Sequence, residues 1–138
     1  MIVKGEEESS DEIENVLPVT YRNNTKVDTP KCTDIWREDA VEDPANFGYG
    51  GLDNLTGVLS FDINDDNAIP QGEWIAGSYV SVVFASVENL FLASYGWSNS
   101  TPIHQFRLAT NSGQTAYVGT ALADGYVLIQ FSMDEYDG

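Results

Sequence analysis

An acidic stretch in the middle of the sequence has the residue types and the spacing of a calcium-binding loop. It runs from residue 62 to residue 73 and reads Asp-Ile-Asn-Asp-Asp-Asn-Ala-Ile-Pro-Gln-Gly-Glu. Calcium takes about six to eight hard oxygen ligands, and a twelve-residue loop commonly supplies them from its first, third, fifth, seventh and last positions. The stretch therefore predicts a calcium site with ligands from Asp62, Asn64, Asp66, the backbone carbonyl of Ala68, and Glu73.

Other features of the same stretch favour a plain acidic connection between two strands. The sixth position, which is normally glycine, is Asn67, although asparagine tolerates the left-handed turn required there. The ninth position is Pro70, and the flanking segments have the composition of strands rather than helices. The residues alone leave open whether this stretch binds calcium or forms a solvated turn, and they indicate no other cofactor.

The sequence contains a single histidine, His104, and a single cysteine, Cys32. One cysteine excludes a disulfide bond within the chain, and we expect a structural thiol at this position. His104 lies in the apolar stretch of residues 101–108, where strand alternation places it on the same face as Phe106 and Leu108. That face is expected to form the core between neighbouring sheets, so the histidine is predicted to be buried and hydrogen-bonded rather than catalytic.

A second group of carboxylates, Asp134-Glu135-Tyr136-Asp137, lies at the end of the sequence. A glycosidase needs two carboxylates at a set separation, and neighbouring side chains at a strand end do not show that arrangement. We therefore expect a solvated turn here and no catalytic residues.

Two further patterns are less specific, namely N-x-Thr sequons and aromatic side chains that could line a ligand surface or pack at sheet edges. The sequons begin at Asn23, Asn54 and Asn99, and the aromatic residues are Tyr49, Tyr95 and Trp97.

The charge balance of the chain excludes several classes of partner. Its 138 residues include 22 acidic and 6 basic side chains, which gives a formal net charge of −16. Nucleic acid and anionic lipid would add repulsion between like charges, so neither is expected to bind.

Residues 1–5 lack the apolar run of a signal peptide, and no run is long enough to span a membrane. The chain is therefore cytoplasmic, or its export signal lies outside this sequence, and we expect no membrane insertion of this segment.

The elements that would position these residues have the pattern of an all-β fold. With 42% hydrophobic and 12% aromatic residues, the chain can bury a core. Residues 1–15 are predicted to be an acidic disordered lead, and residues 16–138 the folded domain. Short edge strands are expected at residues 16–21 and 32–36. Stronger β signals follow at residues 55–63, 79–85, 90–94, 101–108, 116–121 and 125–133.

The spacing of these strands predicts how they are arranged. Four strands between Tyr79 and Ala121 are joined by short connections, which is the size of one β-propeller blade, a four-stranded antiparallel meander. A β-sandwich also has short strands with turn signals and is the alternative. The sequence ends with Asp137-Gly138, a hairpin turn with no returning strand. We therefore expect an incomplete β-propeller of about two to three antiparallel four-stranded blades, truncated at the C-terminus.

Residues 130–138 read Gln-Phe-Ser-Met-Asp-Glu-Tyr-Asp-Gly. They resemble a run in a family of bacterial and archaeal secreted proteins with a C-terminal β-propeller distantly related to WD repeats, except that Ile129 stands where that family often has asparagine. The resemblance implies an extracellular or envelope location, a propeller that continues beyond Gly138, and no known catalytic residues. Further segments that resemble this family are residues 32–35, 59–63, 83–94, 101–106, 116–119 and 125–129.

These observations predict a non-enzymatic β-propeller segment of a secreted or cell-surface protein. The loops of the propeller would bind its partner, which would be a protein, a glycan or a cell-envelope polymer. Two alternatives from other classes are a hydrolase on a propeller scaffold, with catalytic residues outside this sequence, and a calcium-stabilised adhesion module. Several acidic or histidine side chains converging at one pore would favour the hydrolase.

Overall fold

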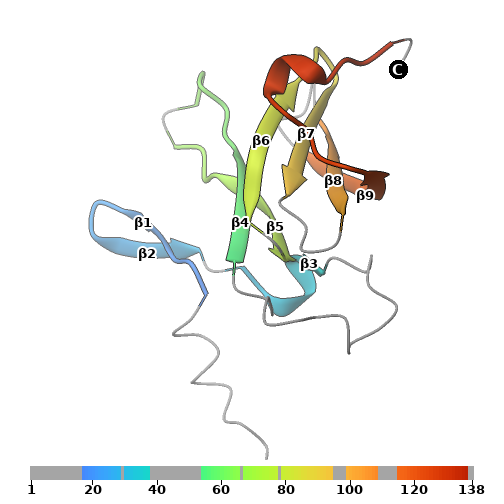
Figure 1. Ribbon diagram of the computed structural model, residues 1–138. Coiled ribbons are helices and arrows are strands. Elements are labelled where there is room, and N and C mark those ends of the chain that lie inside the picture. Colours follow the sequence, from blue (N-terminus) through green and yellow to red (C-terminus); the bar gives the residue numbers. More distant parts are fainter. Residues whose placement is uncertain are drawn as a thin grey trace, which may run out of the picture.

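The computed structural model describes residues 17–28, 30–37, 54–65, 67–77, 79–94, 99–108 and 115–136, and their regular structure consists of β-strands and two short 3-10 turns (Figure 1). None of the helical turns in these ranges is long and apolar enough to cross a membrane. The strands form three sheets. A two-stranded hairpin contains β1 (Thr20–Arg22) and β2 (Thr25–Asp28), and a three-stranded sheet contains β3 (Ile35–Arg37), β4 (Asn54–Ser60) and β5 (Gln71–Gly77). A four-stranded sheet contains β6 (Val80–Ala85), β7 (Asn89–Ser94), β8 (Ser100–Arg107) and β9 (Ala116–Asp124). The 3-10 turns are η1 (Cys32–Asp34) and η3 (Gln130–Ser132).

The four-stranded sheet is the antiparallel meander that the spacing predicts. Its order is β6-β7-β8-β9, and each strand pairs with the next one along the chain. The β6–β7 turn is held by Ser86, whose backbone N–H donates to the Asn89 carbonyl at 2.8 Å and whose hydroxyl accepts from the Asn89 N–H at 3.0 Å. A short polar turn between two apolar runs therefore forms a hairpin where the sequence predicts one.

The three-stranded sheet departs from the predicted pattern. Its order is β3-β5-β4, with β4 antiparallel and β3 parallel to β5. No strand is predicted at residues 71–77. Their sequence, Gln-Gly-Glu-Trp-Ile-Ala-Gly, has two glycines, which are depleted in strands. Pairing along the whole length of β4, from Asn54 opposite Gly77 to Ser60 opposite Gln71, forms this strand despite its low intrinsic propensity.

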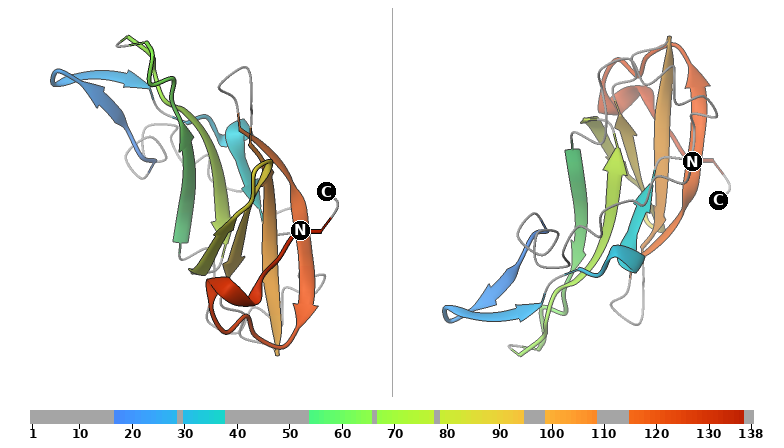
Figure 2. Two further views of the ribbon diagram at one scale, coloured as in Figure 1. Left: turned by 90° about the horizontal axis from the view of Figure 1, so that it is seen from above. Right: turned by 90° about the horizontal axis from the view of Figure 1, so that it is seen from below.

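The core lies between the three-stranded and four-stranded sheets, which Figure 2 shows side by side with β3 next to β9. Ile75 of β5 packs with Leu92 of β7 and Phe106 of β8, and all three are at most 4% exposed. The ring of Trp36 in β3 stacks on that of Tyr117 in β9, with 5.0 Å between centroids. The predicted inward face of β8 is therefore the face that contacts the neighbouring sheet.

The final segment, residues 125–136, is not the strand that the apolar pattern of residues 125–133 predicts. It forms the turn η3 and extended backbone that pairs with no strand in the described ranges (Figure 1). Gly125 has a φ of +92° and donates its N–H to the Asn99 carbonyl, so the chain turns away from β9 at this residue. The segment then lies against the four-stranded sheet, with η3 next to β6.

The hairpin of β1 and β2 projects away from the two larger sheets (Figures 1 and 2). Its turn residues Asn23 and Asn24 have φ of 48° and 64°, the left-handed backbone that a two-residue hairpin turn requires and that asparagine tolerates. The edge strand predicted at residues 16–21 is thus shifted to begin after Pro18. Residues 1–15, the predicted acidic lead, lie outside the described residues.

Candidate binding site

The predicted calcium ligands in the described residues make hydrogen bonds to different parts of the chain. Asp62 and Asn64 lie together in the loop of residues 61–70 between β4 and β5, where Asp62 Oδ1 accepts from the Asn64 backbone N–H at 2.8 Å. The Ala68 carbonyl accepts a hydrogen bond from Arg22 of β1. Glu73 lies within β5 and accepts a hydrogen bond from the indole Nε1 of Trp36 at 2.7 Å. The remaining predicted ligand, Asp66, lies outside the described residues.

These contacts give two of the predicted ligands other partners. The Ala68 carbonyl accepts from the guanidinium of Arg22, and one carboxylate oxygen of Glu73 accepts from the indole of Trp36. Within the described ranges, no three or more His, Cys, Asp or Glu side chains are grouped to hold a metal ion. Calcium binding by this loop stays a prediction that none of these contacts supports.

A different feature, an open pocket of about 490 Å³, lies between the β1–β2 hairpin and the β4–β5 loop. Arg22 connects the two elements, because its Nη1 donates to the Asn67 carbonyl at 2.9 Å while its Nη2 donates to that of Ala68. The guanidinium thereby fixes a hairpin to a loop 45 residues further along the chain. We call this feature the hairpin pocket and define it by Tyr21, Arg22, Phe61, Asp62, Asp65 and Ile69.

The walls of the hairpin pocket combine apolar and polar groups. Tyr21 and Phe61 are 64% and 63% exposed, and Ile69 is 49% exposed. Asp62 and Asp65 each use one carboxylate oxygen to accept a backbone N–H two residues ahead, at 2.8 Å in both cases. These turns hold the two carboxylates among the apolar side chains that line this open pocket.

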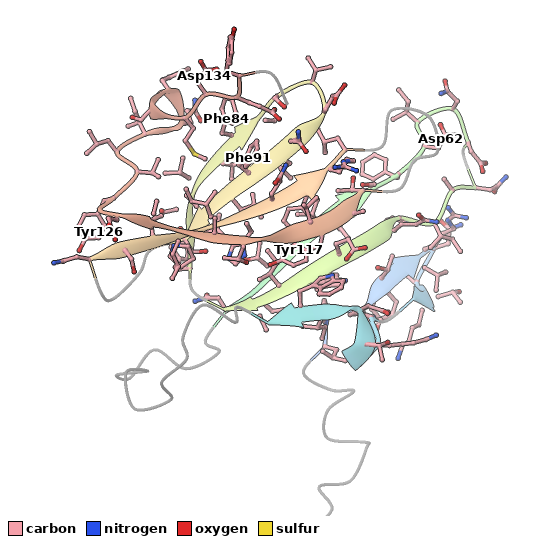
Figure 3. The ribbon with its side chains drawn as sticks, turned by 90° about the vertical axis from the view of Figure 1, so that its right-hand side faces the viewer. Asp62, Phe84, Phe91, Tyr117, Tyr126 and Asp134 are labelled. Carbon is pink, nitrogen blue, oxygen red and sulfur yellow. The ribbon has the colours of Figure 1, made fainter. Side chains whose placement is uncertain are left out.

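His104 is buried and hydrogen-bonded, as the sequence predicts. It is 1% exposed, and its Nδ1 lies 2.7 Å from the hydroxyl of Thr120 on β9. The same hydroxyl is hydrogen-bonded to the phenol of Tyr117, which lies between the two sheets (Figure 3). The histidine is therefore buried and bonded in the core, as strand alternation indicates.

The acidic residues near the C-terminus are not brought to the loop of Asp62, and Figure 3 shows Asp62 and Asp134 on different parts of the molecule. Asp134 accepts the backbone N–H of Glu135, and the Glu135 carboxylate accepts from the side-chain amide of Asn89 on β7. Glu135 therefore fixes the final segment to the four-stranded sheet, a contact that the prediction of a solvated turn misses. Asp137 lies outside the described residues.

The other sequence candidates are scattered. Cys32 lies in η1, while Tyr49, Tyr95 and Trp97 lie outside the described residues. The sequons place Asn23 in the hairpin turn, Asn54 at the start of β4 and Asn99 just before β8.

Sequence reasoning missed the hairpin pocket because its residues come from two separate segments. A signal for half of it exists, since two adjacent asparagines follow Tyr21-Arg22 and precede Thr25-Lys26-Val27, a hairpin pattern. The contact between Arg22 and the loop joins residues 45 and 46 positions apart and has no local signature.

Comparison with known proteins gives a match at the level of the family. The family model described as the beta propeller domain matches residues 2–138. No curated protein and no solved structure shows significant similarity to the chain. A match of this extent agrees with the all-β architecture and the four-stranded meander, and the chain belongs to the beta propeller domain family.

Proposed function

We propose that this chain is a non-enzymatic interaction scaffold of a secreted or cell-surface protein. The propeller fold hosts many unrelated functions, so the proposal depends on the site rather than on the fold. The hairpin pocket carries it, because exposed aromatic side chains and fixed carboxylates around a hollow of about 490 Å³ suit binding of a ligand. The partner would be a protein, a glycan or a cell-envelope polymer.

The placement of the acid–base residues supports a binding role over catalysis. His104 is 1% exposed and engaged with Thr120, so it is poorly placed to meet a substrate. The carboxylates of Asp62 and Asp65 accept hydrogen bonds from neighbouring backbone amides. A hydrolase, the alternative from the sequence, would need catalytic groups beyond these residues, and no contact described above favours it.

The test uses envelope material from cells that carry the gene. Isotope-labelled protein is titrated with solubilised envelope, once after protease treatment and once after periodate oxidation of its glycans. We expect amide shifts in the NMR spectrum confined to the β1–β2 hairpin and residues 61–70, and their loss in the double variant Tyr21→Ala, Phe61→Ala. A matched control is Tyr79→Ala, because Tyr79 is 66% exposed but lies outside the hairpin pocket.

Two results would contradict the proposal. Turnover of an envelope polymer by the purified chain would show an enzyme. Absence of shifts with both fractions would remove the binding role of the hairpin pocket.

A further inference from the structure

We propose that the hairpin pocket binds a neutral, polyhydroxylated ligand, namely a segment of an uncharged glycan. This inference rests on the proposed function, and it names the chemical class of the ligand. Three properties of the described residues support it: the charges of the pocket, its exposed rings, and the orientation of its hydrogen-bonding groups.

The lining of the pocket carries fixed charges of both signs, the carboxylates of Asp62 and Asp65 and the guanidinium of Arg22. An anion would meet the carboxylates of Asp62 and Asp65 and the field of a chain with net charge −16. A cation would be attracted by the carboxylates but would also meet the guanidinium of Arg22, which its bonds to the Asn67 and Ala68 carbonyls hold in place. Hydroxyl groups donate to carboxylates and accept from a guanidinium, so an uncharged polyol suits both.

The exposed rings provide an apolar surface for such a ligand. Tyr21 and Phe61 are 64% and 63% exposed, one on the hairpin and one at the start of the loop, and Ile69 lies beside them at 49% exposure. Covering apolar surface of this kind is favourable by about 25 cal/mol per Å². A sugar ring has one face of C–H groups that can cover an aromatic ring and an equator of hydroxyls that can reach polar groups at the rim.

The carboxylates are oriented before any ligand arrives. One oxygen of Asp62 accepts the Asn64 N–H and one oxygen of Asp65 accepts the Asn67 N–H, both at 2.8 Å. The other carboxylate oxygen of each residue accepts no hydrogen bond from the residues that the structure describes. Acceptors that are already fixed lose little freedom when a hydroxyl binds, which lowers the entropic cost of association.

The experiment compares glycans of similar size that differ in charge. The probes are cellohexaose, maltohexaose and mannohexaose as neutral chains, a chitosan hexamer as the cationic chain, and a hexagalacturonate as the anionic chain, titrated by calorimetry and by amide shifts. We expect at least one neutral chain to bind with shifts in the hairpin and in residues 61–70, and with little dependence on salt. Tyr21→Ala and Phe61→Ala should each weaken that binding by about tenfold or more, as loss of an aromatic anchor does.

Controls separate loss of binding from loss of folding. Tyr21→Phe keeps the ring and should keep the affinity within a few-fold, while Tyr79→Ala should leave it unchanged. Salt-sensitive binding of the chitosan hexamer alone would overturn the inference in favour of electrostatic capture, and neutral-chain binding that survives both alanine variants would place the ligand elsewhere. If every hexamer fails while the periodate-treated envelope still shifts the pocket, the glycan inference fails and the proposed scaffold function stands with a protein partner.

Discussion

The ring of Trp74 covers two glycines of the three-stranded sheet. The six-membered part of the Trp74 indole lies over Gly57 of β4, where a Cβ atom would come within 2.4 Å of Cζ3. The indole nitrogen lies over Gly72 in the same way, at 2.9 Å from a Cβ built there. The ring of Trp74 therefore requires glycine at both positions, and this packing explains why β5 contains Gly72 although glycine is a poor strand former.

Replacement of Gly57 tests this fit. Gly57→Ala would force the Trp74 ring to move, and we expect a loss of about 1–3 kcal/mol in the free energy of unfolding, as for other overpacked positions. Gly119→Ala on β9 is the matched control, because nothing lies within 4 Å of a Cβ there. It should be neutral or stabilise the protein by up to about 1 kcal/mol, since alanine restricts the unfolded chain. Urea unfolding followed by circular dichroism measures both, and equal effects of the two substitutions would contradict the argument.

The hydroxyl of Thr120 is a second residue-level feature, because it contacts both His104 and Tyr117 in the core. Thr120→Val keeps the shape and removes this hydroxyl, and we expect it to cost about 1–3 kcal/mol of unfolding free energy. Thr25→Val at an exposed position of β2 should change stability by less than about 0.5 kcal/mol. A Thr120→Val protein as stable as the parent would show that the hydroxyl contributes nothing net to folding.

At the scale of the elements, local pattern predicts the four-stranded sheet well and the three-stranded sheet poorly. Strands β6 to β9 are continuous β-forming runs separated by turn residues, so their existence, order and antiparallel pairing follow from neighbours along the chain. Strand β5 and the parallel pairing of β3 depend on contacts between distant residues, such as Ile35 opposite Trp74. Patterns of local hydrophobicity do not encode such pairings, and for the same reason they do not reveal the hairpin pocket.

The final segment shows a similar limit. Residues 125–133 have a strand-like composition, but Gly125 turns the chain out of line with β9, and the segment is fixed to the four-stranded sheet by side chains instead of a strand ladder. Asn89 is 6% exposed, donates to Glu135 and accepts from Gln105 at 3.0 Å. Thr101 adds a hydrogen bond of 2.7 Å to the Gly125 carbonyl. The buried amide of Asn89 therefore connects β7, β8 and the final segment.

Removal of this amide should loosen the final segment selectively. We expect Asn89→Ala to lower the hydrogen-exchange protection of residues 125–136 by about tenfold, which corresponds to about 1.4 kcal/mol. Protection of β4 and β5 should change less, because the side-chain hydrogen bonds of Asn89 to Glu135 and Gln105 do not involve these strands. Gln71→Ala, which removes an exposed amide on β5, is the control. Unchanged protection of the final segment in Asn89→Ala would show that apolar contacts alone hold it.

At the scale of the whole molecule, charge and exposed apolar surface act in opposite directions. The net charge of −16 keeps copies of the chain apart, whereas the final segment exposes large apolar side chains. Leu128, Phe131 and Tyr136 are 84%, 83% and 93% exposed. Repulsion between the acidic side chains of one copy also opposes its compact folded state. The amino-acid composition alone predicts this repulsion.

The salt dependence of stability measures that repulsion. The Debye length falls from about 30 Å at 0.01 M to about 3 Å at 1 M ionic strength, so added sodium chloride should raise the free energy of unfolding. Glu88 and Asp124 are exposed, and reversing both to lysine changes the net charge by +4, from −16 to −12. The double variant Glu88→Lys, Asp124→Lys should therefore be more stable than the parent at low salt, and its stability should rise less steeply with salt. Urea unfolding at several sodium chloride concentrations tests this, and potassium chloride controls for effects specific to sodium. Parallel salt curves for the parent and the variant would mean that repulsion across the surface does not limit the stability of this protein.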